Sequence, residues 1–244
     1  MITALSTTSF VRWARRKRFR TARPPVGWAR FGSLRRTTPV SRYFGLDRGS
    51  AIDRHYMDAF LHQHRRDVRG RVLEVGDDRY TVAFGDDRVT TRDVLNAVPG
   101  NPRATFVGDL STGAGLPDHA FDCVILTQVL QYIPDPVAAM AHIQRILAPG
   151  GVVLAILPGL AKTDRGHDGS WSDWWRFTER SAAALFHHAF SPDRVETRTY
   201  GNVLAVTAAL MGLAQEDLRP AELDVHDPDY PLVFAIRATR SEQP

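Results

Sequence analysis

The stretch Arg71-Val72-Leu73-Glu74-Val75-Gly76 is a short run of apolar and β-branched residues that ends on a carboxylate and a glycine. Such a run predicts a buried strand over 71–75 that leads into a tight turn. Two more strand-like runs follow, 88–93 ending on Asp93 and 104–108 ending just before Asp109. Parallel strands bring their carboxyl ends to one edge of a sheet, where open α/β folds bind nucleotide-like ligands. We therefore expect Glu74, Asp93 and Asp109 to lie together at a ligand site.

Strand and helix signals alternate through the chain, which predicts parallel strands joined by right-handed crossovers. The longest helix has prolines at its start, Pro134 and Pro136, and Pro149-Gly150-Gly151 at its end, the usual order of start and stop residues. The predicted fold is a Rossmann-like, doubly wound, mostly parallel sheet in three α/β/α layers. Its predicted strands span 71–75, 88–93, 104–108, 121–127 and 151–157, and its helices about 77–84, 134–148 and 178–189.

Both flanks of this core also carry signals. After the core, residues 195–200, 203–213 and 232–238 predict a strand, a helix and a strand, and the two strands are expected to form an antiparallel C-terminal edge. Before it, residues 37–66 are expected to form a cap segment that contains a helix. Ser50 suits the N-cap of that helix and Asp53 its capping-box position.

Composition narrows the class of protein. With 244 residues, 43% of them hydrophobic, the chain can bury one main core, which we place at 67–244. The single cysteine, Cys123, excludes an internal disulfide. No apolar run reaches the roughly 18–20 residues of a membrane span. A cytoplasmic protein is expected.

Positive charge is concentrated at the N-terminus. Residues 1–50 hold 12 of the 31 basic residues and a single acid, Asp47, which leaves 19 basic and 26 acidic residues for the remainder. We expect 1–36 to be a flexible, solvated tail. A basic arm for an acidic partner, a membrane surface or nucleic acid is the alternative, and the composition also resembles an organellar transit peptide. Because the body of the chain is acidic, a nucleic-acid-binding surface is not expected.

Two motifs carry a family resemblance. The run from Phe121 to Ile133 (FDCVILTQVLQYI) is followed by Arg145-Ile146-Leu147-Ala148-Pro149-Gly150-Gly151. Together they resemble the fourth strand and the turn before the fifth strand of class I S-adenosylmethionine-dependent methyltransferases, over roughly residues 67–244. The segment 175–178 (WRFT) is similar to a subgroup of these enzymes associated with sugar and polysaccharide genes. The resemblance implies S-adenosylmethionine as cofactor.

The first glycine motif departs from the family pattern of acid-x-Gly-x-Gly-x-Gly, because Glu74-Val75-Gly76 runs into Asp77 and Asp78. A dinucleotide needs bare glycines and a positive helix terminus for its pyrophosphate. S-adenosylmethionine has no phosphate and carries a sulfonium and an ammonium cation, which acids at this turn would attract. These acids therefore argue against NAD more strongly than against S-adenosylmethionine. A simpler explanation is that they favour the N-terminus of the next helix.

The resemblance implies a role for each residue that matches the motifs. Gly76 would let the backbone approach the methionine part of the cofactor while Glu74 fixes that loop. Asp93 would bind the ribose hydroxyls, and Asp109 with Leu110 the adenine amino group. Packing, turn or surface roles are the alternatives for all of them. The complete set of predicted cofactor-binding residues is Glu74, Gly76, Asp77, Asp93, Asp109, Leu110, Gln128, Arg54 and Tyr56.

The loop 159–177 is long enough to be a lid or substrate loop. Its aromatic and acidic residues suit a hydroxylated or planar acceptor, and the predicted substrate residues are His167, Asp173, Trp175 and Arg176. Packing of the tryptophans onto the core is the alternative. No metal site is expected, because the His and Asp spacing in the loop matches no ligand pattern. The sequence names no catalytic base.

Two functions remain open. The first is methyl transfer from S-adenosylmethionine to a small molecule or glycan, at oxygen. The second is a non-catalytic relative that keeps the fold as a binding or scaffold protein, motivated by the missing glycines and the absence of an evident base. An NAD-dependent enzyme would need a glycine-rich turn that the chain lacks. A nucleic-acid methyltransferase rests only on the basic N-terminus.

Overall fold

The computed structural model describes residues 32–166, 169 and 172–242. Its internal contacts divide the chain into two units, Met1–Thr38 and Pro39–Pro244. Of the first unit, the described part holds a single 3-10 turn, η1 (Gly32–Leu34). The tail predicted over 1–36 lies almost entirely outside the described residues. Everything that follows concerns the second unit.

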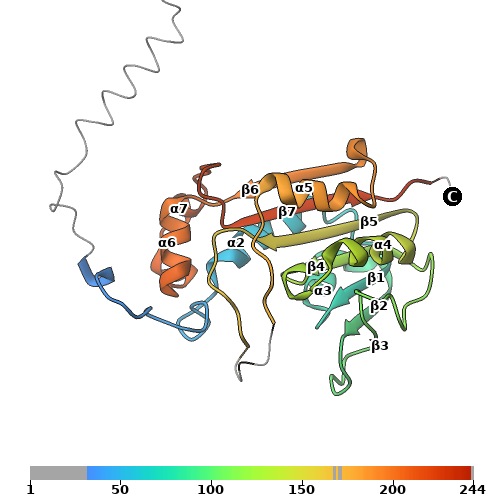
Figure 1. Cartoon of the computed structure of the whole chain (residues 1–244), viewed down its shortest axis with the longest axis horizontal. Coiled ribbons are helices and arrows are strands. Elements are labelled where there is room, and N and C mark those ends of the chain that lie inside the picture. The colour runs from blue at the N-terminus through green and yellow to red at the C-terminus, as the bar shows by residue number, and fades with distance from the viewer. Residues whose placement is uncertain (1–31, 167–168, 170–171, 243–244) are drawn as a thin grey trace, which may run out of the picture. The chain divides into compact units, whose positions relative to one another are not determined.

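The core of the second unit is one seven-stranded sheet with the order β3-β2-β1-β4-β5-β7-β6 (Figure 1). The neighbours from β3 to β5 pair in parallel, whereas β7 is antiparallel to both β5 and β6. This confirms the predicted mostly parallel sheet with an antiparallel C-terminal edge. The strands are β1 (Gly70–Val75), β2 (Val89–Asn96), β3 (Phe106–Val107), β4 (Phe121–Thr127), β5 (Leu147–Pro158), β6 (Val195–Tyr200) and β7 (Val233–Thr239).

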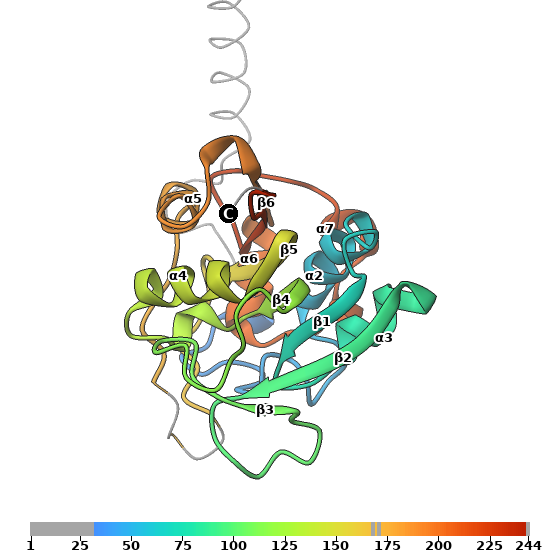
Figure 2. The same ribbon diagram turned by 90° about the vertical axis from the view of Figure 1, so that its right-hand side faces the viewer.

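Helices cover both faces of this sheet (Figure 2). Side chains alternate along each strand, so that Leu73 and Val124 face one hydrophobic cluster and Val72 and Cys123 face the other. The first cluster includes α4 (Pro136–Ile146) and α5 (Glu179–His187). The second includes α2 (Ile52–Gln63), α3 (Arg79–Gly85), α6 (Val203–Met211) and α7 (Pro220–Leu223). The remaining 3-10 turns are η2 (Asp86–Arg88), η3 (Leu130–Tyr132), η4 (Pro192–Arg194) and η5 (Gln215–Asp217).

The first residues of two helices show which local signals fix where a helix begins. Helix α4 begins after Asp135, whose side chain accepts a hydrogen bond from the Ala138 amide at 3.0 Å, and it has proline at its first position. Helix α5 begins after Thr178, which exchanges capping hydrogen bonds with Ser181. In both cases one polar residue just before the helix supplies the missing partner for its first amide groups.

The predicted N-cap of α2 is wrong. The helix begins one residue later than a Ser50 cap would allow, after Ala51, and no side chain caps it. The Ser50 amide instead donates to the Glu216 carboxylate at 2.9 Å, and the Ser50 carbonyl accepts from the Gln215 amide at 2.8 Å. A distant segment therefore replaces the local cap and holds the start of α2.

Residues 211–217, which include the segment that holds Ser50, also hold residues 39–51 in place. The Val40 amide donates to the Met211 carbonyl at 2.7 Å, and Arg48 forms an ion pair with Asp217 at 2.7 Å. These contacts place the turn at 43–46 beside the carboxyl ends of the strands, where the candidate site lies. No helix among the described residues is long and apolar enough to cross a membrane.

Candidate functional site

A cavity of about 410 Å³ opens at the carboxyl ends of β1 and β4. Its walls come from seven parts of the chain: the turn at 43–46, the first half of α2, the β1–α3 turn, the segment after β4, the loop after β5, α6 at Ala209, and the start of β7. Of the predicted site residues, it is lined by Arg54, Gly76, Asp77, Gln128, Asp173 and Arg176. It is also lined by residues that the sequence did not single out for the site, including Asp53, Thr127, Gln131, Tyr132, Lys162 and Asp164.

Gly76 contributes only backbone atoms to the cavity wall. It has φ +88°, and a Cβ built there would meet no atom within 4 Å. Its amide donates to the Leu95 carbonyl at 2.9 Å, and its carbonyl accepts from the Asn101 side chain at 2.7 Å. These two hydrogen bonds hold the turn in place. The Cα of Gly76 stays open toward the cavity, which Val75 and Asp77 also line.

Glu74 lies beneath this turn and does not line the cavity. Its buried carboxylate accepts hydrogen bonds from the Tyr80 amide at 3.1 Å and from the Thr81 amide and hydroxyl, each at 2.8 Å. Burial raises the pKa of Glu74 to about 7, although these hydrogen bonds oppose the shift. The carboxylate satisfies the first amides of α3, which would otherwise lack partners.

The prediction that three acids gather at one sheet edge is wrong. Strand β2 continues past Asp93 to Asn96, so Asp93 lies within the strand, opposite Leu73. Because side chains alternate, Asp93 points to the Leu73 face and Glu74 to the other. Asp93 forms an ion pair with Arg71 at 2.6 Å and lies outside the cavity.

Asp109 and Leu110 also lie outside the cavity. The Asp109 carboxylate accepts hydrogen bonds from the amide and hydroxyl of Ser111, and its backbone pairs with Ala114. This is the turn role that its residue type allows. Leu110 is buried in the cluster beneath α4.

The segment after β4 supplies the polar wall. Gln128 has φ +56°, and its amide donates to the Ile156 carbonyl at 2.9 Å. Its side chain donates to Asp53 at 3.3 Å and accepts from Gln131 at 3.1 Å. Gln128 is therefore fixed at the cavity by contacts on both of its sides.

Of the two cofactor-binding residues predicted on the cap helix, one lines the cavity and the other does not. Arg54 lines the cavity at the start of α2. Tyr56 is buried, donates its hydroxyl hydrogen to the Leu223 carbonyl at 3.0 Å, and stacks on Tyr200 at 5.7 Å between ring centroids. Tyr56 thus joins α2 to the C-terminal segment and lies outside the cavity.

The loop after β5 is tied together by a buried ion pair. The Asp173 side chain is only 1% exposed, and Arg176 donates to both of its oxygens at 2.6 Å. The same carboxylate accepts from the Asp164 amide at 2.6 Å, and the Asp164 carboxylate accepts from the Tyr132 hydroxyl at 2.8 Å. This network holds the loop against η3.

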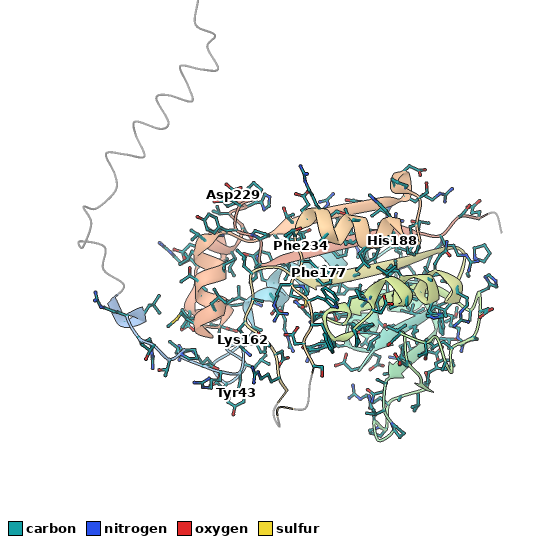
Figure 3. The ribbon with its side chains drawn as sticks, in the orientation of Figure 1. Tyr43, Lys162, Phe177, His188, Asp229 and Phe234 are labelled. Carbon is teal, nitrogen blue, oxygen red and sulfur yellow. The ribbon has the colours of Figure 1, made fainter. Side chains whose placement is uncertain are left out.

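One predicted substrate residue lies elsewhere, and another falls outside the described residues. Trp175 is 40% exposed, donates its indole N–H to the Ile133 carbonyl at 2.9 Å, and does not line the cavity. His167 lies outside the described residues. Lys162, labelled in Figure 3, lines the cavity, with its ammonium 3.4 Å from the centroid of the Phe44 ring. Burial lowers the pKa of Lys162.

Comparisons with known proteins show what the chain is similar to. Residues 62–155 match the family model described as a methyltransferase domain. The S-adenosylmethionine-dependent methyltransferase of Mesorhizobium loti superposes with a TM-score of 0.51 at 16% identity, over 78% of this chain and 100% of that one. The 1,6-didemethyltoxoflavin N1-methyltransferase of Burkholderia thailandensis gives 0.49 at 17% identity, over 99% and 93% of the two chains. No curated protein matches the chain.

The match over residues 62–155 identifies a methyltransferase domain, and the fold is the Rossmann-like fold of class I S-adenosylmethionine-dependent methyltransferases. The similar Mesorhizobium loti protein is described as an S-adenosylmethionine-dependent methyltransferase. The predicted class and cofactor are thereby confirmed.

Proposed function

We propose that this protein transfers the methyl group of S-adenosylmethionine to a hydroxyl group of a small molecule or glycan. The observation that carries the proposal is the cavity at the ends of β1 and β4, whose floor at Gly76 is bare backbone. A ligand can approach that backbone closely without meeting a side chain. The proposal keeps the loop 159–177 as the lid on the acceptor side and 37–66 as the cap segment.

The charges near the β1–α3 turn suit a ligand without phosphate. Asp77 lines the cavity, while Asp78 forms ion pairs with Arg92 at 3.7 Å and Arg103 at 3.4 Å. An acid facing the cavity at this turn repels a pyrophosphate and attracts a cation. In this proposal Gly76 and Gln128 contact the methionine part of the cofactor, and Arg54 binds its carboxylate.

The acceptor side of the cavity is polar. Tyr132 and Asp164, joined by their 2.8 Å hydrogen bond, line it together with Lys162. Burial and the Asp164 carboxylate raise the pKa of Tyr132, so the tyrosine keeps its proton. These groups can donate to and accept from a hydroxylated acceptor. Methyl transfer is an in-line displacement in which the protein mainly aligns the two reactants and excludes water.

The experiment that tests this function has two stages. Isothermal titration calorimetry of the full chain with S-adenosylmethionine should show one binding site per chain. Incubation with cofactor labelled in its methyl group and a cell extract should then give a labelled small molecule or glycan. Absence of binding at millimolar cofactor would overturn the proposal. Binding without transfer to any acceptor would favour the non-catalytic alternative.

Substituting Gly76 by alanine should reduce cofactor affinity by at least about tenfold, because the new Cβ enters the space that the ligand needs. The positive φ should also lower the free energy of unfolding by about 1–2 kcal/mol. Gly150 provides a matched control: its φ is +74°, its Cβ would make only an ordinary contact with Glu242, and it lies at the far end of β5. Gly150→Ala should carry the same strain and bind cofactor normally. Equal losses of affinity in both variants would contradict the prediction.

A further inference from the structure

Four carboxylates line the cavity, and among the described residues only Asp173 of the four has an ion pair within 4.0 Å. Asp173 is paired with Arg176, and Asp164 accepts hydrogen bonds from the Tyr132 hydroxyl and the Gly166 amide. Asp77 accepts from the Arg79 amide two residues on, as an aspartate in a turn commonly does. Asp53 is the fourth: it lies in the first turn of α2 and accepts a hydrogen bond from the side chain of Gln128, the residue proposed above to contact the methionine part of the cofactor.

Asp53 faces the cavity without a cationic partner. Its side-chain partner is the neutral amide of Gln128, at 3.3 Å. Among the described residues, no ion pair within 4.0 Å involves Asp53, and the charge of the adjacent Arg54 acts on it only at longer range. Burial raises the pKa of Asp53 against the opposing effects of Arg54 and of its hydrogen bonds. An acid in the first turn of a solvated helix would instead be stabilised in its charged form.

The position of Asp53 is fixed before any ligand binds. The Gln215 side chain donates to the Ala51 carbonyl at 2.8 Å, and Ala51 pairs with Ala214, so the start of α2 is anchored to the C-terminal segment. On the other side, Gln128 is held by Gln131 at 3.1 Å. Asp53 therefore has little freedom to turn toward another partner.

Asp53 is half-buried, and a carboxylate partly removed from water is destabilised unless a cation or hydrogen bonds compensate it. The cavity offers Asp53 hydrogen bonding but no directly paired cation, which leaves the cation to come from the ligand. S-adenosylmethionine carries two cationic groups, the sulfonium and the ammonium, both in its methionine part. A ligand with that part would complete the charge balance of the site.

We propose that Asp53 is the counter-ion of the cationic methionine part of the cofactor. The inference rests on the proposed function, because it assumes that this cavity binds S-adenosylmethionine. It adds a residue that selects for charge: ligands that keep the adenosyl group but lack a cation do not use Asp53.

The test is calorimetry on the wild-type chain and on Asp53→Asn, which keeps the side-chain shape and removes the charge. Three ligands are used: S-adenosylmethionine, S-adenosylhomocysteine, which lacks the sulfonium, and 5′-methylthioadenosine, which lacks both cations. We expect Asp53→Asn to weaken S-adenosylmethionine about 10- to 100-fold, as for loss of a charge-assisted hydrogen bond, and to leave 5′-methylthioadenosine unchanged.

S-adenosylhomocysteine then identifies which cation of the cofactor pairs with Asp53. If it loses as much affinity as S-adenosylmethionine, Asp53 pairs with the ammonium, and if it loses none, Asp53 pairs with the sulfonium. The matched control is Asp58→Asn, which removes an exposed carboxylate from the same helix outside this cavity and should bind all three ligands normally.

Two results would overturn the inference: unchanged affinity of Asp53→Asn for S-adenosylmethionine, or equal losses for all three ligands. Thermal unfolding of each variant without ligand shows whether a loss comes from misfolding. If the wild-type chain itself bound no S-adenosylmethionine, the proposed function would fail instead, so the two failures are distinguishable.

Discussion

Replacing Arg176 by alanine is expected to lower the free energy of unfolding by about 3–5 kcal/mol, the cost of leaving a buried charge without its partner. The Asp173 side chain is 1% exposed, and Arg176 donates to both of its oxygens. The same arginine also donates to the Ala161 carbonyl at 3.2 Å and to the Lys162 carbonyl, so its loss frees the loop after β5. Urea unfolding followed by circular dichroism measures the change.

Two further variants show whether burial is the cause. Removing both partners, Asp173→Ala with Arg176→Ala, should cost less than Arg176→Ala alone, because no unpaired carboxylate remains. Arg198→Ala breaks an exposed ion pair with Glu196 and should cost no more than about 1 kcal/mol. A double variant that is as unstable as the sum of its single variants would refute the explanation.

Replacing Glu74 by alanine is the second change with a large expected effect, a loss of about 3–5 kcal/mol in the free energy of unfolding. The two amide groups and the hydroxyl that donate to Glu74 would stay buried without an acceptor, and each such group costs about 1–3 kcal/mol. Glu196→Ala, which removes an exposed glutamate from β6, should cost no more than about 1 kcal/mol.

The pH dependence of stability gives an independent test of the Glu74 environment. Burial raises its pKa from 4.5 to about 7, so between these values the unfolded chain releases this proton while the folded chain keeps it. The contribution of Glu74 to the free energy of unfolding should therefore fall as pH rises from 4.5 to 7, by roughly 3 kcal/mol in total, and then level off. The difference between the wild-type protein and Glu74→Gln, measured by urea unfolding at several pH values, should show this slope. A difference that is constant with pH would rule it out.

Local patterns were enough to predict the sheet and most helices. The run 71–75 and the segment 121–127 are short, apolar and rich in β-branched residues, which favours strands, and the structure contains both strands. Asp93 shows where such patterns fail. Strand β2 continues for three residues past the predicted end, so that end fell on an acid within the strand whose side chain points to the face opposite to Glu74.

The residues missed at the site are held there by contacts between distant segments. Asp53 meets Gln128 across 75 positions of sequence, and Tyr132 meets Asp164 across 32. No spacing rule within a helix or strand reports such pairs. Gly76 could be predicted because a glycine directly after a strand has a local meaning, the tight turn that its φ of +88° allows.

The position of β7 bears on when the protein becomes functional during its synthesis. This last strand lies between β5 and β6, and the residues at its start, Leu232 and Val233, line the cavity. A nascent chain therefore cannot complete its binding pocket while those residues are still inside the ribosomal exit tunnel. Premature termination shortly before residue 232 would leave β6 without a strand to join it to β5, so such fragments would lack ligand protection and be exposed to proteolytic degradation.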